Sequence, residues 1–159
     1  MPWRIIRHEV SVEAPIEDVW EAWTTEQGVH SFFAPASRID LCVGGAYEIL
    51  FDPAASPGER GAEGTQLLAL QPPRMLAFTW NAPPHLVDVR PQFTHVQIWI
   101  QGETADKTLV TLIHTGWGVG GQWDEAYAYF ERAWGEVVLP RLARRFAQGP
   151  IDWNQPAER

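Results

Sequence analysis

Apolar and polar residues alternate along the first strand-like segment, residues 3–13. One side of the alternation carries Ile6, His8, Val10 and Val12, while the other carries charged and hydroxyl side chains. A repeat of two residues is the period of a half-buried β-strand. We therefore expect this segment to lie in a sheet, with the first set facing a core.

The repeat changes after Pro15, at a position where a first helical turn tolerates proline. Val19, Trp20 and Trp23 then give the segment one apolar side, which predicts a short helix. A second short helix is expected from 26 to 33. It should end before the next proline, because the residue that precedes a proline is disfavoured in the helical conformation.

Antiparallel strands are predicted for the middle of the chain. Alternation and turn residues place them at about 37–43, 46–52, 64–71, 74–80, 93–103 and 107–115. Two connections, residues 52–63 and 81–92, are rich in Pro, Gly and charge and are longer than a hairpin requires. We expect these two loops to form the rim of a cavity.

One long helix is predicted in the last third of the chain. At roughly 100° per residue its apolar stripe covers about a third of the circumference and comprises Trp123, Tyr127, Phe130, Trp134, Val137 and Val138. So wide a stripe needs a large apolar partner, which the concave face of a curved sheet supplies. Pro140 lacks a backbone donor and predicts a bend. The pattern indicates an α+β fold, a curved antiparallel sheet wrapped around a long C-terminal helix, with two short helices after the first strand.

Length and charge narrow the class of protein. The 159 residues fit one domain over 1–148, with 149–159 as a tail in which Trp153 is the anchor. The net charge of -8 argues against nucleic acid as a partner. We interpret Arg141, Arg144 and Arg145 as positive charges that interact favourably with the negative end of the helix dipole.

The single cysteine and the lack of long apolar runs bear on the cellular location of the protein. Cys42 is the only cysteine, which excludes an intramolecular disulfide and suits a reducing compartment; we interpret it as a small buried side chain. No run of about 20 apolar residues and no signal-peptide core is present. We expect a cytoplasmic protein without membrane insertion, and both a monomer and a homodimer are compatible with the sequence.

Four segments carry a likeness to a known family: 14–24 (APIEDVWEAWT), 32–35 (FFAP), 72–80 (PPRMLAFTW) and 111–117 (TLIHTGW), the last followed by the closing helix. The chain resembles the SRPBCC (START/Bet v 1-like) superfamily, in particular the branch named after the activator of Hsp90 ATPase homologue 1. The resemblance covers residues 5 to about 147. It implies a helix-grip fold whose cavity accepts apolar or amphipathic small molecules. It implies no single chemistry, because members include carriers, cyclases and aromatase-like proteins.

Two histidines are the candidate catalytic residues. Alternation places His114 and His8 on the faces expected to be concave. A neutral imidazole there can orient a polar ligand group or act as a general base near neutral pH. The alternative is a core histidine whose hydrogen bonds are satisfied within the protein. No metal or cofactor is expected, because His-x-x-x-His and Cys-x-x-Cys are absent and the five histidines are scattered.

The expected ligand-binding residues come from the inward faces of the strands and from the helix stripe. They are His8, Val10, Phe32, Tyr47, Ile49, Phe51, Phe78, Trp80, Ile98, Leu112, His114, Trp117, Trp123, Tyr127, Phe130 and Trp134. Core packing alone explains any one of the aromatics, but their number favours a pocket. The leading hypothesis is binding of a hydrophobic or aromatic small molecule between helix and sheet. The alternatives are a cyclase-, hydratase- or hydrolase-like enzyme that uses His114 as acid-base, and a protein-interaction or co-chaperone-like module.

Overall fold

The computed structural model describes residues 3–155. Its elements are β1 (Ile6–Val12), α1 (Ile16–Thr24), α2 (Glu26–His30), β2 (Ala36–Ile39), β3 (Tyr47–Leu50), β4 (Gly61–Ala62), β5 (Leu67–Gln71), β6 (Met75–Trp80), β7 (Thr94–Thr104), β8 (Lys107–Thr115), α3 (Gln122–Arg132), the π-helical segment η1 (Ala133–Val138) and α4 (Leu139–Gln148). Every helix and strand expected from the sequence is present. The two-residue strand β4 was not anticipated, because it lies inside the first of the two long loops.

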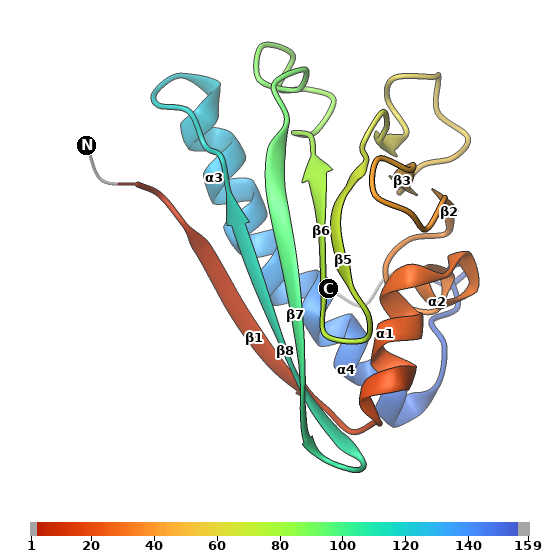
Figure 1. Ribbon diagram of the computed structural model, residues 1–159. Coiled ribbons are helices and arrows are strands. Elements are labelled where there is room, and N and C mark those ends of the chain that lie inside the picture. The colour runs from red at the N-terminus through yellow and green to blue at the C-terminus, as the bar shows by residue number, and fades with distance from the viewer. Residues whose placement is uncertain (1–2, 156–159) are drawn as a thin grey trace.

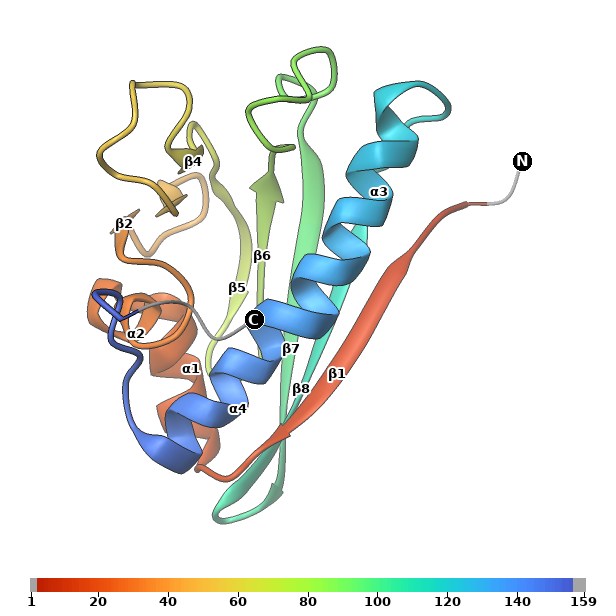
Figure 2. The same ribbon diagram turned by 180° about the vertical axis from the view of Figure 1, so that it is seen from behind.

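Two antiparallel sheets are formed. The larger has the strand order β1-β8-β7-β6-β5, and the smaller has the order β2-β3-β4. An isolated bridge between Ala46 and Gln66 connects them. Figure 1 shows the large sheet from its outer side, and Figure 2 shows the long helix lying across its other face. This arrangement confirms the predicted α+β helix-grip fold.

Burial in the sheet follows the predicted alternation. On β8 the side chains of Thr108, Val110, Leu112 and His114 are buried, while those between them are partly exposed. On β1 Ile6 and Val12 are fully buried. The apolar face of the sheet and the stripe on the helix therefore share one core.

The helix is irregular one turn before the position where a bend was expected. The backbone N–H of Leu139 donates to the carbonyl of Trp134, five residues back, as in a π-helix. Pro140 has no N–H to offer the carbonyl four residues before it, and its ring crowds that carbonyl. A widened turn ahead of the proline accommodates both effects, so the predicted irregularity is present as η1.

The C-terminal tail packs against the end of α2. The N–H of Ile151 donates to the carbonyl of Ser31 (2.9 Å), and the indole N–H of Trp153 donates to the carbonyl of His30 (2.6 Å). Trp153 therefore has the anchoring role that the sequence predicted. Cys42 is exposed, in contrast to the expectation, because it lies in the turn between β2 and β3 rather than on the inner face.

Membrane insertion was not expected, and one structural observation bears on it. Within residues 3–155, no helix has the length and apolar character needed to cross a bilayer.

Candidate functional site

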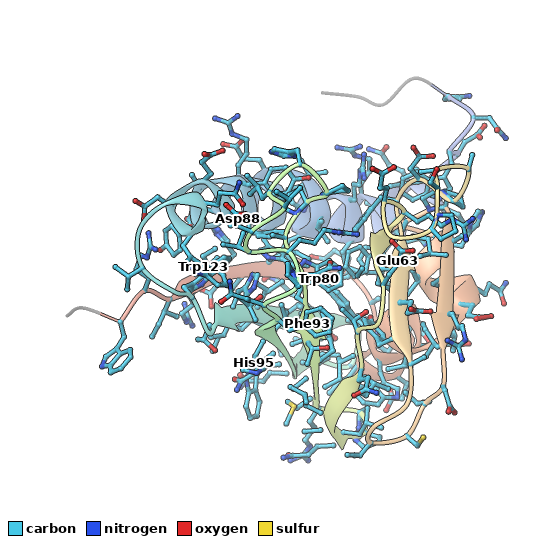
Figure 3. All side chains as sticks on the ribbon, turned by 90° about the horizontal axis from the view of Figure 1, so that it is seen from above. Glu63, Trp80, Asp88, Phe93, His95 and Trp123 are labelled. Carbon is cyan, nitrogen blue, oxygen red and sulfur yellow. The ribbon has the colours of Figure 1, made fainter. Side chains whose placement is uncertain are left out.

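A cavity of about 390 Å³ opens between the long helix and the two loops that were predicted to form a rim. Its lining comes from the end of β3 and the following loop (Phe51, Asp52, Glu59, Arg60, Gly61, Ala62), from β6 and the second loop (Trp80, Asn81, Ala82, Pro83, Pro84, Arg90) and from the helix (Tyr129, Phe130, Ala133, Trp134, Val137, Val138, Arg141). In Figure 3, which views the molecule from the loop end, Trp80 lies between Glu63 of one loop and Asp88 of the other. The residues enclosing the cavity are thus far apart in sequence.

Aromatic rings form the inner wall of the cavity. Trp80 and Trp134 lie with ring centroids 5.3 Å apart, and Phe130 stacks on Trp134 at 6.1 Å. Phe33 backs Trp80 from the core side, also stacked, at 5.9 Å. Such interlocked rings have little rotamer freedom. The wall is therefore preformed.

Arg90 holds the two rim loops together. Its Nη1 donates to the carbonyl of Ala82 in its own loop, and its Nη2 donates to the carbonyls of Gly58 (2.8 Å) and Gly61 (2.7 Å) in the other. Nη2 also lies 3.3 Å from the carboxylate of Glu63. The planar guanidinium can satisfy several acceptors at once. This one side chain fixes the width of the cavity mouth.

Glu63 is ionised in this cluster. Burial acts to raise the pKa of Glu63, but the backbone N–H groups of Gly58 and Arg60 and the charge of Arg90 outweigh it and lower that pKa. Burial lowers the pKa of Arg90, although an arginine remains charged in proteins. The rim is thus held by a charge-assisted network.

His114 is sealed in the core beside the cavity and does not line it. Its side chain is 0 % exposed, and Nδ1 accepts the indole N–H of Trp134 (3.0 Å). Because Trp can only donate, the ring proton lies on Nε2, which donates to the hydroxyl of Thr94 (2.6 Å). Burial, with a smaller effect from His95, lowers the pKa of His114 to about 3. The imidazole is therefore neutral with both nitrogens occupied, as in the alternative of a satisfied core histidine.

His8 lies outside the cavity, on the other side of the helix. Its side chain is 25 % exposed, and Nε2 lies 3.0 Å from the carbonyl of Glu131 and 3.2 Å from its carboxylate. The ring packs against Gly135, where an added Cβ would fall 2.7 Å from it. These contacts serve to attach β1 to the helix.

Four of the expected ligand-binding residues line the cavity: Phe51, Trp80, Phe130 and Trp134. Six are sealed in the core, namely Phe32, Tyr47, Ile49, Phe78, Ile98 and Leu112. Val10 packs at the margin of that core, and Trp117 and Trp123 pack on a second cluster beneath the loop of residues 81–92. Tyr127 and His8 line a separate groove outside the cavity. Alternation indicates which side chains point inward, but not which of them reach the cavity. Contact of any of these residues with a ligand stays a prediction.

The charged part of the lining was missed. Arg141 was assigned to the helix dipole, yet it follows Val137 and Val138 by one turn and lines the cavity with them. Spacing of three and four residues along a helix was the available signal. Arg60 and Arg90 lie in the rim loops, where no periodic pattern indicates direction.

Comparisons with solved structures support the fold. DynU16, a protein of the dynemicin biosynthetic locus, matches with a TM-score of 0.68 at 23 % identity over 94 % of this chain, which spans about half (49 %) of DynU16. CalU16 from Micromonospora echinospora matches with a TM-score of 0.66 at 22 % identity, covering 96 % of this chain and 79 % of CalU16. The Aha1 dimer from Colwellia psychrerythraea matches with a TM-score of 0.67 at 18 % identity, covering 92 % and 98 %.

Sequence comparison identifies the family. No curated protein matches the chain. The family model described as activator of Hsp90 ATPase homolog 1-like protein matches residues 13–147, most of the chain. The sequence resemblance is thereby confirmed: the chain belongs to the activator of Hsp90 ATPase homolog 1-like family of the SRPBCC fold.

Proposed function

We propose that this protein binds a hydrophobic or aromatic small molecule in the cavity between the long helix and the rim loops. The observation that carries the proposal is the preformed wall of Trp80, Phe130 and Trp134 in a cavity of about 390 Å³. Small-molecule sites are typically concave, mostly apolar and about 300–1,000 Å³ in volume. The volume of this cavity and its mostly apolar lining match those properties.

The rim supports the same proposal. Arg90 fixes the two loops, so little loop ordering has to accompany binding. Phe51, Tyr129 and Val137 are 39–48 % exposed at the cavity and give it an apolar entrance. The likeness to DynU16, a protein of a biosynthetic locus, is consistent with a small organic ligand.

The acid–base alternative receives no such support. His114 offers no free ring nitrogen, and the carboxylates that line the cavity, Asp52 and Glu59, are exposed. We therefore propose binding rather than turnover, in a single domain over residues 1–148. The single cysteine favours a reducing compartment, and we propose the cytoplasm.

The test is a titration with N-phenyl-1-naphthylamine, a neutral planar molecule whose fluorescence rises in apolar surroundings. Ala133 lines the cavity, so Ala133→Phe should fill part of it and weaken binding at least tenfold. Ala128→Phe is the matched control, because Ala128 is exposed on the same helix and does not line the cavity. Wild-type affinity in a natively folded Ala133→Phe protein would overturn the proposal.

A further inference from the structure

Arg141 lies at the cavity with its cationic group held in place. It is in α4, lines the cavity and is only partly exposed. Its guanidinium carbon lies 5.2 Å from the centroid of the Trp153 ring, a cation–π arrangement. Trp153 is in turn fixed by its hydrogen bond to the carbonyl of His30. The tail therefore holds the guanidinium of a residue that lines the cavity.

This cation has no anionic partner in the part of the chain that the structure describes. None of the ion pairs formed by residues 3–155 includes Arg141. Burial and then the like charge of Arg144 lower the pKa of Arg141. A partly buried charge without a counter-ion is unfavourable. An anion at this place would relieve both effects.

The other two arginines of the lining, Arg90 and Arg60, both donate hydrogen bonds within the protein. The guanidinium of Arg90 donates to three backbone carbonyls and pairs with Glu63. The Nε of Arg60 donates to the carbonyl of Ala55 (2.8 Å). Asp52 and Glu59 are exposed, whereas the arginines are partly buried. A protein with a net charge of -8 does not attract anions through its overall field. Selection of an anion must therefore be local.

We propose, building on the proposed function, that the ligand is an anionic amphiphile. Its apolar body lies against Trp80, Phe130 and Trp134. Its oxyanion, a carboxylate, sulfonate or phosphate-type group, pairs with the guanidinium of Arg141, a geometry for which arginine is suited. Trp153 is a positioning residue that orients Arg141 and does not contact the ligand.

A matched pair of probes tests this. 8-Anilinonaphthalene-1-sulfonate has the ring system of N-phenyl-1-naphthylamine plus one sulfonate, so the ratio of their dissociation constants isolates the anion. In 0.15 M salt the wild type should bind the sulfonate at least tenfold more tightly. Arg141→Gln should abolish this preference while changing binding of the neutral probe less than twofold. Arg38→Gln, which removes an exposed arginine outside the cavity lining, is the control and should retain the preference.

Two results would overturn the proposal: equal affinity of the wild type for both probes, or a preference that survives in Arg141→Gln. Both leave the cavity proposal standing, because the neutral probe still binds. Two other results would instead refute the proposed function. One is that neither probe binds, and the other is that Ala133→Phe leaves the affinity for the neutral probe unchanged.

The role of Trp153 has its own readout. Trp153→Leu should reduce the preference for the sulfonate at least threefold and leave the neutral probe unaffected, and Trp153→Phe should restore part of it because a ring face is retained. An equal loss for both probes would mean that Trp153 is merely structural and would refute its positioning role.

Discussion

The indole N–H of Trp134 donates to Nδ1 of His114 over 3.0 Å, which ties the long helix to β8. The other ring nitrogen of His114 donates to Thr94, whose hydroxyl donates to the carbonyl of Trp80 (3.3 Å). Both cavity-wall tryptophans are thus joined through one buried chain of hydrogen bonds. His114 supports the wall of the cavity rather than acting inside it.

The two tryptophans should respond differently to the same substitution. Both are at most 2 % exposed, but the indole nitrogen of Trp80 has no hydrogen-bond partner among residues 3–155, whereas that of Trp134 has His114. Trp134→Phe leaves Nδ1 of His114 buried and unsatisfied, so it should cost about 1–3 kcal/mol more than Trp80→Phe. Urea unfolding at pH 7 measures the difference. Equal losses would contradict the hydrogen-bond assignment.

His114 should also make stability depend on pH. Its pKa is about 3 in the folded protein and 6.5 ordinarily, so between these values the unfolded chain binds the extra proton. The stabilisation is complete above pH 6.5 and is lost as the pH falls toward 3. Between pH 7 and 5 the wild type should lose about 2 kcal/mol more than His114→Gln, which has no titrating ring.

Urea unfolding of both proteins at several pH values checks this. The carboxylates act equally on both, so the difference between the two curves reports His114 alone. Parallel curves would show that the imidazole is not held neutral.

Periodicity predicted the fold and the three aromatic residues of the cavity wall, Trp80, Phe130 and Trp134. Phe130 and Trp134 were found because helical spacing fixes a face, and the rim loops because their length and composition set them apart. The sealing of His114 was not predictable, because Thr94 and Trp134 each lie 20 residues away and approach only in the folded sheet. The hydrogen bonds of Arg90 to the other loop were not predictable either, because their acceptors lie about 30 residues earlier in the sequence.

Arg90 should be intolerant of even a conservative change. Arg90→Lys keeps the charge but loses the planar fork that reaches Ala82, Gly58 and Gly61, so it should cost at least about 2 kcal/mol. Arg38 is the control. It pairs with Glu48, but its own side chain is 73 % exposed. Arg38→Lys should change the unfolding free energy by at most about 0.5 kcal/mol.

Chemical denaturation of the two variants gives the comparison, and the neutral naphthylamine reports on the cavity mouth. Arg90→Lys should weaken the binding of that probe, while Arg38→Lys should not. Similar stabilities for the two variants would refute the role given to Arg90.

Gly135 and His8 should be energetically coupled. A Cβ on Gly135 would meet the His8 ring, 2.7 Å from its Cε1, and displace it from the carbonyl of Glu131. Gly135→Ala should therefore destabilise the wild type, although alanine is the better helix former by about 1 kcal/mol. In a His8→Ala background the same change should stabilise the protein. A double-mutant cycle measures the coupling, and additive effects would contradict the contact.

The most direct test of the central claim is a crystal structure of the protein with bound N-phenyl-1-naphthylamine. The account predicts that the naphthyl ring lies against Trp80, Phe130 and Trp134, beneath the loops that Arg90 joins. A probe found only elsewhere, for example in the groove beside His8 and Tyr127, with the cavity left empty at saturating probe, would contradict it.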